Sequence, residues 1–266
     1  MNKKRYKKVI INRIVASAFA VAVIFAVVIV IVANANHSTP SNDAEETSAD
    51  NSTASISLNK DFTVLLDAGH GFSDLGAYSS YTKEYESSYT LPYVMKLKEN
   101  LEQMGAVVLL THDGSTYPDE PSILDEAQSS GYLDTWPGVL LDDEEDDNYN
   151  KYERVAYSNS VYENTGFDLF ISLHFNDSEQ DLEGFEVYYD LDNPNASAME
   201  GLCNELQSSV LDADLFEHAY VLGTEDEDSF VVTKYCDYSA ILIEGGNMDT
   251  RGWMLIRKIL HSPSYV

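Results

Sequence analysis

Three apolar runs of strand length constrain this fold more than any other feature of the sequence. They cover residues 62–66, 167–173 and 240–243, and they consist mainly of Val, Ile, Leu and Phe. A short run that is apolar at successive positions predicts a strand buried on both faces, as in a parallel sheet. The first run ends in a glycine-rich turn, Asp67-Ala-Gly-His-Gly71, and the other two end directly at polar residues. The carboxyl ends of such strands are where open α/β sheets collect ligands and catalytic groups.

A helix and another strand follow the first run in the order of a β–α–β crossover. Apolar residues recur at helical spacing from Leu91 to Met104, and Gly105 is a natural helix stop. The strand predicted over 106–111 then lies parallel to the first. Together these elements predict a single α/β domain over residues 61–266. Further helices are predicted over 151–164, 196–211 and 253–260, and further strands over 184–189 and 230–233.

The amino-terminal segment differs sharply in composition from the rest of the chain. Residues 1–13 carry six Lys and Arg and no acid, and residues 14–34 carry no charge at all. About 20 apolar residues can cross a bilayer, so 14–34 is predicted to be a transmembrane signal anchor with a cytoplasmic basic segment and an exported remainder. Ala33-Asn34-Ala35 also resembles a cleavage site, which would make the protein secreted, but the apolar run is longer than the roughly 7–15 residues of most signal peptides. Residues 35–60 are polar and predict a disordered linker.

The exported part is strongly acidic. It holds all 45 Asp and Glu but only ten of the 16 Lys and Arg, which gives it a formal charge of −35. Such a surface argues against nucleic acid as a partner. Cys203 and Cys236 lie in a compartment that permits disulfides, and whether they pair stays open.

A long acidic insertion separates the second predicted strand from the next helix. Residues 112–150 show no clear periodicity, and 142–147 are all Asp or Glu. Loops of this length tend to be functional or disordered. The EF-hand spacing and its glycine are missing, so a solvated acidic segment is favoured over a calcium site.

Four side chains at element ends form a candidate metal site. His70 and His174 follow the first and second apolar runs, Glu244 ends the third, and Glu86 lies where the first helix begins. In a mostly parallel sheet these strand ends share one edge, so residues distant in sequence converge there. Two imidazoles and one carboxylate, with an open fourth position, are the ligand set of a catalytic zinc site. A remaining carboxylate can act as general base.

Four motifs, taken in order, resemble the zinc-dependent N-acetylmuramoyl-L-alanine amidases of the amidase_3 type, which are bacterial cell-wall hydrolases. The resemblance covers residues 62–260, and it implies a twisted, mostly parallel sheet with helices on both faces. It also implies one Zn²⁺ ion held by His70, Glu86 and His174, with Glu244 as the catalytic residue. The motifs are Asp67-Ala-Gly-His-Gly71, Glu86 to Leu91, Phe170-Ile-Ser-Leu-His-Phe-Asn176 and Ile243-Glu-Gly-Gly-Asn-Met248.

One ligand position has a competitor. Glu84 lies two residues before Glu86 and is an alternative second ligand. Glu86 is preferred because the family's glutamate precedes a helix leucine by five residues, as Glu86 precedes Leu91.

The resemblance implies peptidoglycan as the substrate and cleavage of the amide that joins N-acetylmuramic acid to the L-alanine of the stem peptide. Arg154 matches a family arginine, and it is expected either to brace the sheet edge or to contact substrate. Asn176 and Asn247 flank the predicted site as candidate substrate contacts, with a structural turn as the alternative for each. Inserted segments cover the site in some related amidases, so we hypothesise that the 112–150 insertion covers this one until an activating protein displaces it.

Two other functions stay open. One is a catalytically silent, membrane-anchored relative that regulates or scaffolds cell-wall enzymes. The other is a zinc hydrolase that cleaves a different amide. The presence of all three candidate ligands and Glu244 favours an enzyme over the silent relative.

Overall fold

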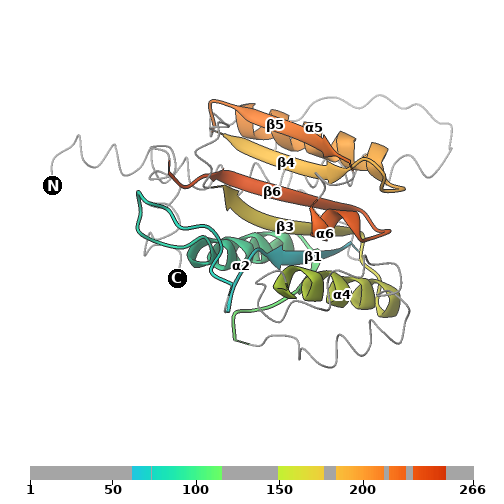
Figure 1. The fold of residues 1–266 in the computed structure, drawn as a ribbon. Helices are drawn as coiled ribbons and strands as arrows, with labels where there is room; N and C mark the ends of the chain where they lie inside the picture. The colour runs from blue at the N-terminus through green and yellow to red at the C-terminus, as the bar shows by residue number, and fades with distance from the viewer. Residues whose placement is uncertain are drawn as a thin grey trace.

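The computed structural model describes residues 62–72, 74–115, 149–176, 184–212, 216–225 and 230–249, which form an α/β domain around one six-stranded sheet. The strand order is β2-β1-β3-β6-β4-β5 (Figure 1). The strands are β1 (Thr63–Ala68), β2 (Val107–Leu110), β3 (Leu169–Asn176), β4 (Phe185–Asp190), β5 (Ala219–Thr224) and β6 (Ala240–Asn247). The helices are α2 (Ser87–Gln103), α4 (Tyr149–Asn164), α5 (Ala196–Asp212) and α6 (Val231–Lys234).

The sheet is parallel at every pairing except one. β1 pairs with β2 and β3, β3 with β6, and β4 with β5, all in parallel. β4 runs antiparallel to β6, so the beginning of β4 lies beside the end of β6. That edge of the sheet therefore receives the carboxyl ends of β1, β3 and β6 and also the amino end of β4.

Helices cover both faces of the sheet (Figure 1), and a hydrophobic core lies on each face. Alternate strand residues point to opposite faces, so Leu173 and Ile243 pack with α2 and α5 in the larger core, whereas Phe170 and Leu242 pack with α4 and α6 in the smaller one. His174 lies four residues after Phe170 on β3, and Glu244 lies two residues after Leu242 on β6, so each points to the same face as the earlier residue. Their side chains therefore leave the sheet on the α4/α6 face.

The predicted α/β class, the mostly parallel sheet and the helices on both faces are confirmed. The predicted strand over 230–233 is wrong, because Val231–Lys234 forms a single helical turn whose Val232 packs into the smaller core. A four-residue β-branched run cannot by itself distinguish a strand from a buried turn, so packing decides. The edge strand β5 was not predicted. It contains Gly223 and is largely half-exposed, so its strand pattern is weak.

Several predicted segments lie outside the described residues. They are the basic segment 1–13, the anchor 14–34, the linker 35–60, most of the acidic insertion 112–150 and the helix 253–260. Within the described part of the chain, no helix has the length and apolar character needed to span a bilayer.

Candidate metal centre

His70 occupies a constrained turn directly after β1. Its φ angle of 62° lies in the left-handed region, which costs free energy for a residue with a side chain and is often found at functional sites. The imidazole is fixed at both nitrogens. Nδ1 donates to the Asp74 carboxylate at 2.9 Å, and Nε2 lies 2.9 Å from Oε2 of Glu86. Asp74 therefore selects the orientation that presents Nε2 to Glu86.

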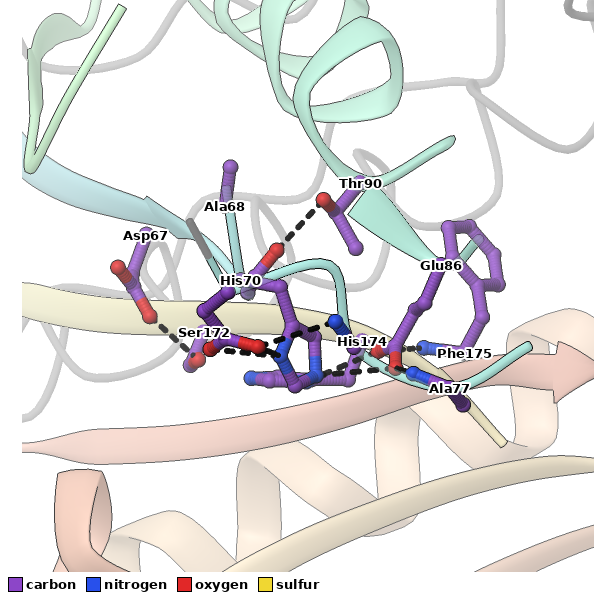
Figure 2. A network of polar contacts seen from close by, with 12 residues as sticks. Asp67, Ala68, His70, Ala77, Glu86, Thr90, Ser172, His174 and Phe175 are labelled. Carbon is purple, nitrogen blue, oxygen red and sulfur yellow. Dashed lines mark hydrogen bonds and ion pairs between the residues drawn. The ribbon is translucent and has the colours of Figure 1, made fainter. Parts of the chain in front are cut away.

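Glu86 lies immediately before α2 and is almost fully buried, at 3% exposure. Its Oε2 faces His70 and accepts from the Ala77 amide at 3.2 Å. Its Oε1 lies 3.0 Å from Nδ1 of His174 and accepts from the Phe175 amide at 2.9 Å. Figure 2 shows dashed contacts from the Glu86 carboxylate to both imidazoles.

Glu84, the competing candidate ligand, has a different role in the structure. Its carboxylate accepts a hydrogen bond from the Tyr89 hydroxyl. The cluster of possible metal donors among the described residues contains Glu86 and not Glu84.

Two glycines leave room for the two imidazoles, Gly69 for His174 and Gly76 for His70. A Cβ on Gly69 would lie 2.3 Å from the His174 ring, so only glycine fits there. At Gly76 a Cβ would lie 2.6 Å from the His70 ring, and the φ angle of 67° also favours glycine. The His70 and His174 rings meet edge to face, with their centroids 4.8 Å apart. The local backbone is therefore shaped to hold both imidazoles close together.

The donor atoms of His70, Glu86 and His174 all lie within 4.8 Å of one another. The three donors come from separate parts of the chain, and the chemical set of two imidazoles and one carboxylate suits a catalytic metal. The candidate ligands predicted from the sequence are thus brought together, and they fit a metal ion.

The charges of the cluster are strongly interdependent. Burial alone would lower the pKa of His70, but its contacts with Asp74 and Glu86 outweigh burial and raise this pKa to about 9. Burial would raise the pKa of Glu86, yet the two histidines hold it well below its usual range. The Glu86 carboxylate is therefore an anion, which is the state that binds a cation.

Glu244 lies beside the cluster, on the neighbouring strand. It is the register partner of His174 across the β3–β6 pair, so both side chains leave the same face of the sheet. Its Oε2 is shielded from solvent. The predicted catalytic residue is therefore next to the candidate metal ligands.

The sequence analysis did not identify a second buried carboxylate at this edge. Glu186 at the start of β4 is the antiparallel register partner of Glu244 and is 1% exposed. It accepts a hydrogen bond from the Tyr188 hydroxyl, and Asn176 Nδ2 lies 3.5 Å from its Oε1. Burial and these carboxylates raise the pKa of Tyr188, so its hydroxyl stays a proton donor. The sequence offered one signal for this site, namely that Glu186 is an acid within an otherwise apolar or aromatic predicted strand.

Arg154 lies in the interior and supports the sheet edge. It is 4% exposed, its Nε is 3.2 Å from Oδ1 of Asp67, and its terminal nitrogen donates to the His70 carbonyl at 3.3 Å. Asp67 also accepts from Thr111 and Ser172, each at 2.7 Å. These contacts match the bracing role that was one of its two predicted roles.

The two asparagines occupy different environments. Asn176 points to Glu186, as described above, and it is the register partner of Asn247 across β3 and β6. Asn247 Oδ1 accepts from the Asp249 amide at 2.9 Å, which is a local turn contact. A structural turn was the alternative to substrate contact for both asparagines, and the Asn247 contact is of that kind. Asn176 instead lies beside the carboxylates of Glu186 and Glu244.

The cysteines are not bonded to each other. Cys203 and Cys236 are both free and buried, and they belong to the two different cores. Burial raises the pKa of Cys203 to about 12 and raises that of Cys236 as well, so both thiols stay protonated and unreactive.

Comparison with known proteins identifies a family that matches most of the chain. Residues 64–254 match Amidase_3, described as N-acetylmuramoyl-L-alanine amidase. A curated relative from Staphylococcus saprophyticus, "Probable cell wall amidase LytH", is 32% identical over 190 residues, which are 70% of this chain and 48% of the relative. The chain thus spans about half the length of this relative.

Solved structures share the fold. An N-acetylmuramoyl-L-alanine amidase from Clostridium difficile 630 aligns with a TM-score of 0.51 at 20% identity, over 77% of this chain and 88% of that one. The CwlD amidase from Clostridioides difficile, solved in complex with the GerS lipoprotein, also aligns at 0.51, with 21% identity over 75% and 98% of the two chains.

Proposed function

Because this chain belongs to the Amidase_3 family of N-acetylmuramoyl-L-alanine amidases, we propose that it hydrolyses the amide between N-acetylmuramic acid and the L-alanine of the peptidoglycan stem peptide. The observation that carries this proposal is the convergence of His70, Glu86 and His174 within 4.8 Å, beside Glu244. Family membership supports the substrate, and the side chains at the sheet edge supply groups that such a hydrolysis needs.

We propose Zn²⁺ as the cofactor, one ion for each chain. His70 would bind it through Nε2, His174 through Nδ1 and Glu86 through its carboxylate, since these atoms face one another. A zinc ion held there supplies Lewis acidity, which polarises an amide carbonyl and makes a water molecule acidic near neutral pH.

Glu244 is the proposed proton carrier. Its carboxylate takes the proton of the attacking water and passes it to the nitrogen of the leaving L-alanine. Glu186 lies opposite Glu244 on β4, where Tyr188 and Asn176 contact its carboxylate oxygens. These contacts fix the position of the Glu186 carboxylate opposite the proposed catalytic residue, Glu244.

The cellular setting is also a proposal. The charge pattern of residues 1–34 supports a single-pass anchor in the cell membrane with the catalytic domain outside. An activating protein partner is supported by CwlD, a relative in fold that was solved with a lipoprotein. Peptidoglycan remains the proposed substrate.

Digestion of purified peptidoglycan with the zinc-loaded full chain tests the proposed bond specificity. The expected product is new amino-terminal alanine, with no new reducing sugar ends. Glu244→Gln should lower this activity by at least 100-fold because it removes the proton acceptor but keeps the shape of the side chain. Reducing ends would show a glycosidase and overturn the proposal.

The same digestion separates the two alternatives. A silent regulator would release nothing from peptidoglycan even when loaded with zinc. A zinc hydrolase of another amide would leave the alanine bond intact but release a different amino terminus. The buried Glu86 carboxylate and the paired imidazoles favour an active site over a silent one, because such a polar cluster is costly to keep buried unless it is used.

A further inference from the structure

An exposed aromatic surface borders the candidate metal centre. Among the described residues, ten large apolar side chains are exposed, and five of them belong to the short connection between His70 and Glu86. Exposed apolar residues are normally scattered along a chain, so five within one short connection, two of them packed ring against ring, indicate a binding surface. We call this cluster the aromatic platform. Its members, each between 41% and 46% exposed, are Phe72, Leu75, Tyr78, Tyr81 and Tyr85.

The aromatic platform is joined closely to the metal ligands. Gly76 lies so close to the metal ligands that an added Cβ would be 2.6 Å from the His70 ring and 2.9 Å from Oε2 of Glu86, and Leu75 precedes it directly. Ala77 exchanges backbone and side-chain hydrogen bonds with Glu86, and Tyr78 follows it directly. Tyr78 and Tyr85 are thus each one residue away from the bonded Ala77 and Glu86, so a molecule held on their rings would lie near the catalytic edge.

The backbone that carries the aromatic platform is well fixed. Tyr78 and Tyr85 form a bridge between the two sides of the connection, and their rings lie 4.9 Å apart. At its tip, the buried Ser79 hydroxyl donates to Asp249 at 2.8 Å, and the Tyr81 amide donates to the same carboxylate at 3.2 Å. Because Asp249 lies just beyond β6, these bonds hold the platform against the end of the sheet where Glu244 lies (Figure 1).

We propose that the aromatic platform binds the glycan strand of peptidoglycan, a polymer of N-acetylated aminosugars. This inference rests on the proposed function. The scissile amide is attached to a sugar through a short lactyl group, so a sugar must lie directly beside the metal ligands. Aromatic faces stack on the C–H faces of pyranose rings, and tyrosine hydroxyls can bond to sugar hydroxyls and N-acetyl groups.

The charge of the domain favours a glycan over a membrane surface. The part of the chain beyond residue 42 has a formal charge of −35. Such a domain is repelled by anionic lipid head groups, which would oppose insertion of the aromatic platform into the bilayer. In intact peptidoglycan the lactyl carboxyl groups are amidated by the stem peptides, so the sugar backbone that the aromatic platform would meet carries no charge of its own.

Binding of an uncharged N-acetylglucosamine hexamer to the zinc-loaded full chain tests this proposal by isothermal titration calorimetry. This glycan lacks the scissile amide, so its binding does not depend on hydrolysis. The double variant Tyr78→Ala/Tyr85→Ala should bind at least tenfold more weakly. The variant Tyr78→Phe/Tyr85→Phe should retain most of the affinity because it keeps both rings. Leu211→Ala, an exposed apolar residue on α5, is the control and should bind like the wild type.

Two further measurements make the outcome decisive. The zinc affinity of the double alanine variant should match that of the wild type, which shows that Glu86 is undisturbed. Binding to vesicles of phosphatidylcholine and phosphatidylglycerol should be weak and unaffected by the substitutions.

Glycan affinity equal in the wild type and the alanine variant, or absent in both, would overturn the proposal. Vesicle binding that only the alanine variant loses would also overturn it. If hydrolysis of peptidoglycan fails while glycan binding follows these expectations, the proposed function falls and the glycan site stands.

Discussion

Asp74 determines which nitrogen of His70 can bind a metal ion. Both of its carboxylate oxygens lie 2.9 Å from Nδ1, and the Gly76 amide donates to Oδ1 at 3.0 Å, which fixes the carboxylate in turn. Carboxylates placed in this way behind a ligating histidine orient the ring and raise its basicity. Asp74 is therefore a positioning residue for the proposed zinc site, although it contacts neither zinc nor substrate.

Asp74→Asn should weaken zinc binding by about 10- to 100-fold without unfolding the domain. The amide can still accept a hydrogen bond, but it lacks the negative charge that supports His70. Competition with a calibrated chelator measures the dissociation constant. Asp113→Asn removes an exposed carboxylate that accepts hydrogen bonds from Ser115 in its own turn, and it should bind zinc normally. Equal zinc affinity in both variants would rule out the role of Asp74.

Glu86 and Glu84 can be separated by the same measurement. Glu86→Gln should abolish stoichiometric zinc binding, because the anionic oxygens that face the two imidazoles are lost. Glu84→Gln should keep one zinc ion per chain, since this carboxylate accepts from Tyr89 instead. Zinc content measured after dialysis distinguishes the two. Loss of zinc in Glu84→Gln with retention in Glu86→Gln would reverse the ligand assignment.

The Asp67–Arg154 pair joins several elements beneath the metal centre. Asp67 is the last residue but one of β1 and is fully buried. It accepts hydrogen bonds from Ser172 on β3 and from Thr111, which follows β2, whereas Arg154 belongs to α4. Arg154 also donates to the carbonyl of His70, so the pair links helix, sheet and ligand turn. Removing one partner of such a buried pair leaves an uncompensated charge.

Arg154→Met should lower the free energy of unfolding by about 3–5 kcal/mol at pH 7, measured by urea denaturation. Burial would raise the pKa of Asp67, but Arg154 and the hydroxyl donors hold it below its usual value. The stability that Asp67 contributes is therefore fully present above its unfolded pKa of about 3.9 and is lost as the pH falls through the lower folded pKa. The difference between the two proteins should accordingly shrink below about pH 4.

Lys96→Met is the matched control for this prediction. It removes an exposed ion pair with Glu99 on α2, so the free energy of unfolding should change by less than about 0.5 kcal/mol. A similar small effect for Arg154→Met, or a difference from wild type that grows at low pH, would contradict the proposed role of the buried pair.

At the scale of the whole molecule, the site depends on strand ends that local sequence patterns reveal. The runs before His70, His174 and Glu244 are mostly apolar, so their strands and their common edge follow from pattern alone. The direction of β4 cannot be predicted from local sequence, because its antiparallel pairing with β6 depends on tertiary structure. Glu186 was missed for that reason, since its place opposite Glu244 depends on the reversed strand.

The turn after β1 shows a second limit of sequence interpretation. The motif around His70 identified a candidate ligand, but the contact from Asp74 depends on the left-handed φ of His70 and on the close approach of Gly76. Short β-branched segments such as 230–233 show a third limit, because packing against α4 and the sheet decides their structure. Local pattern therefore predicted the positions of the candidate ligands, whereas the residues that orient them required the three-dimensional structure.

The central claim is that one ion joins three distant parts of the chain at the carboxyl edge of the sheet. Anomalous diffraction at the zinc absorption edge, from crystals of the zinc-loaded protein, tests it most directly. The account predicts one peak, about 2.0–2.2 Å from His70 Nε2, His174 Nδ1 and a carboxylate oxygen of Glu86. A zinc peak bound elsewhere, or imidazoles of His70 and His174 that face apart around an empty edge, would contradict it.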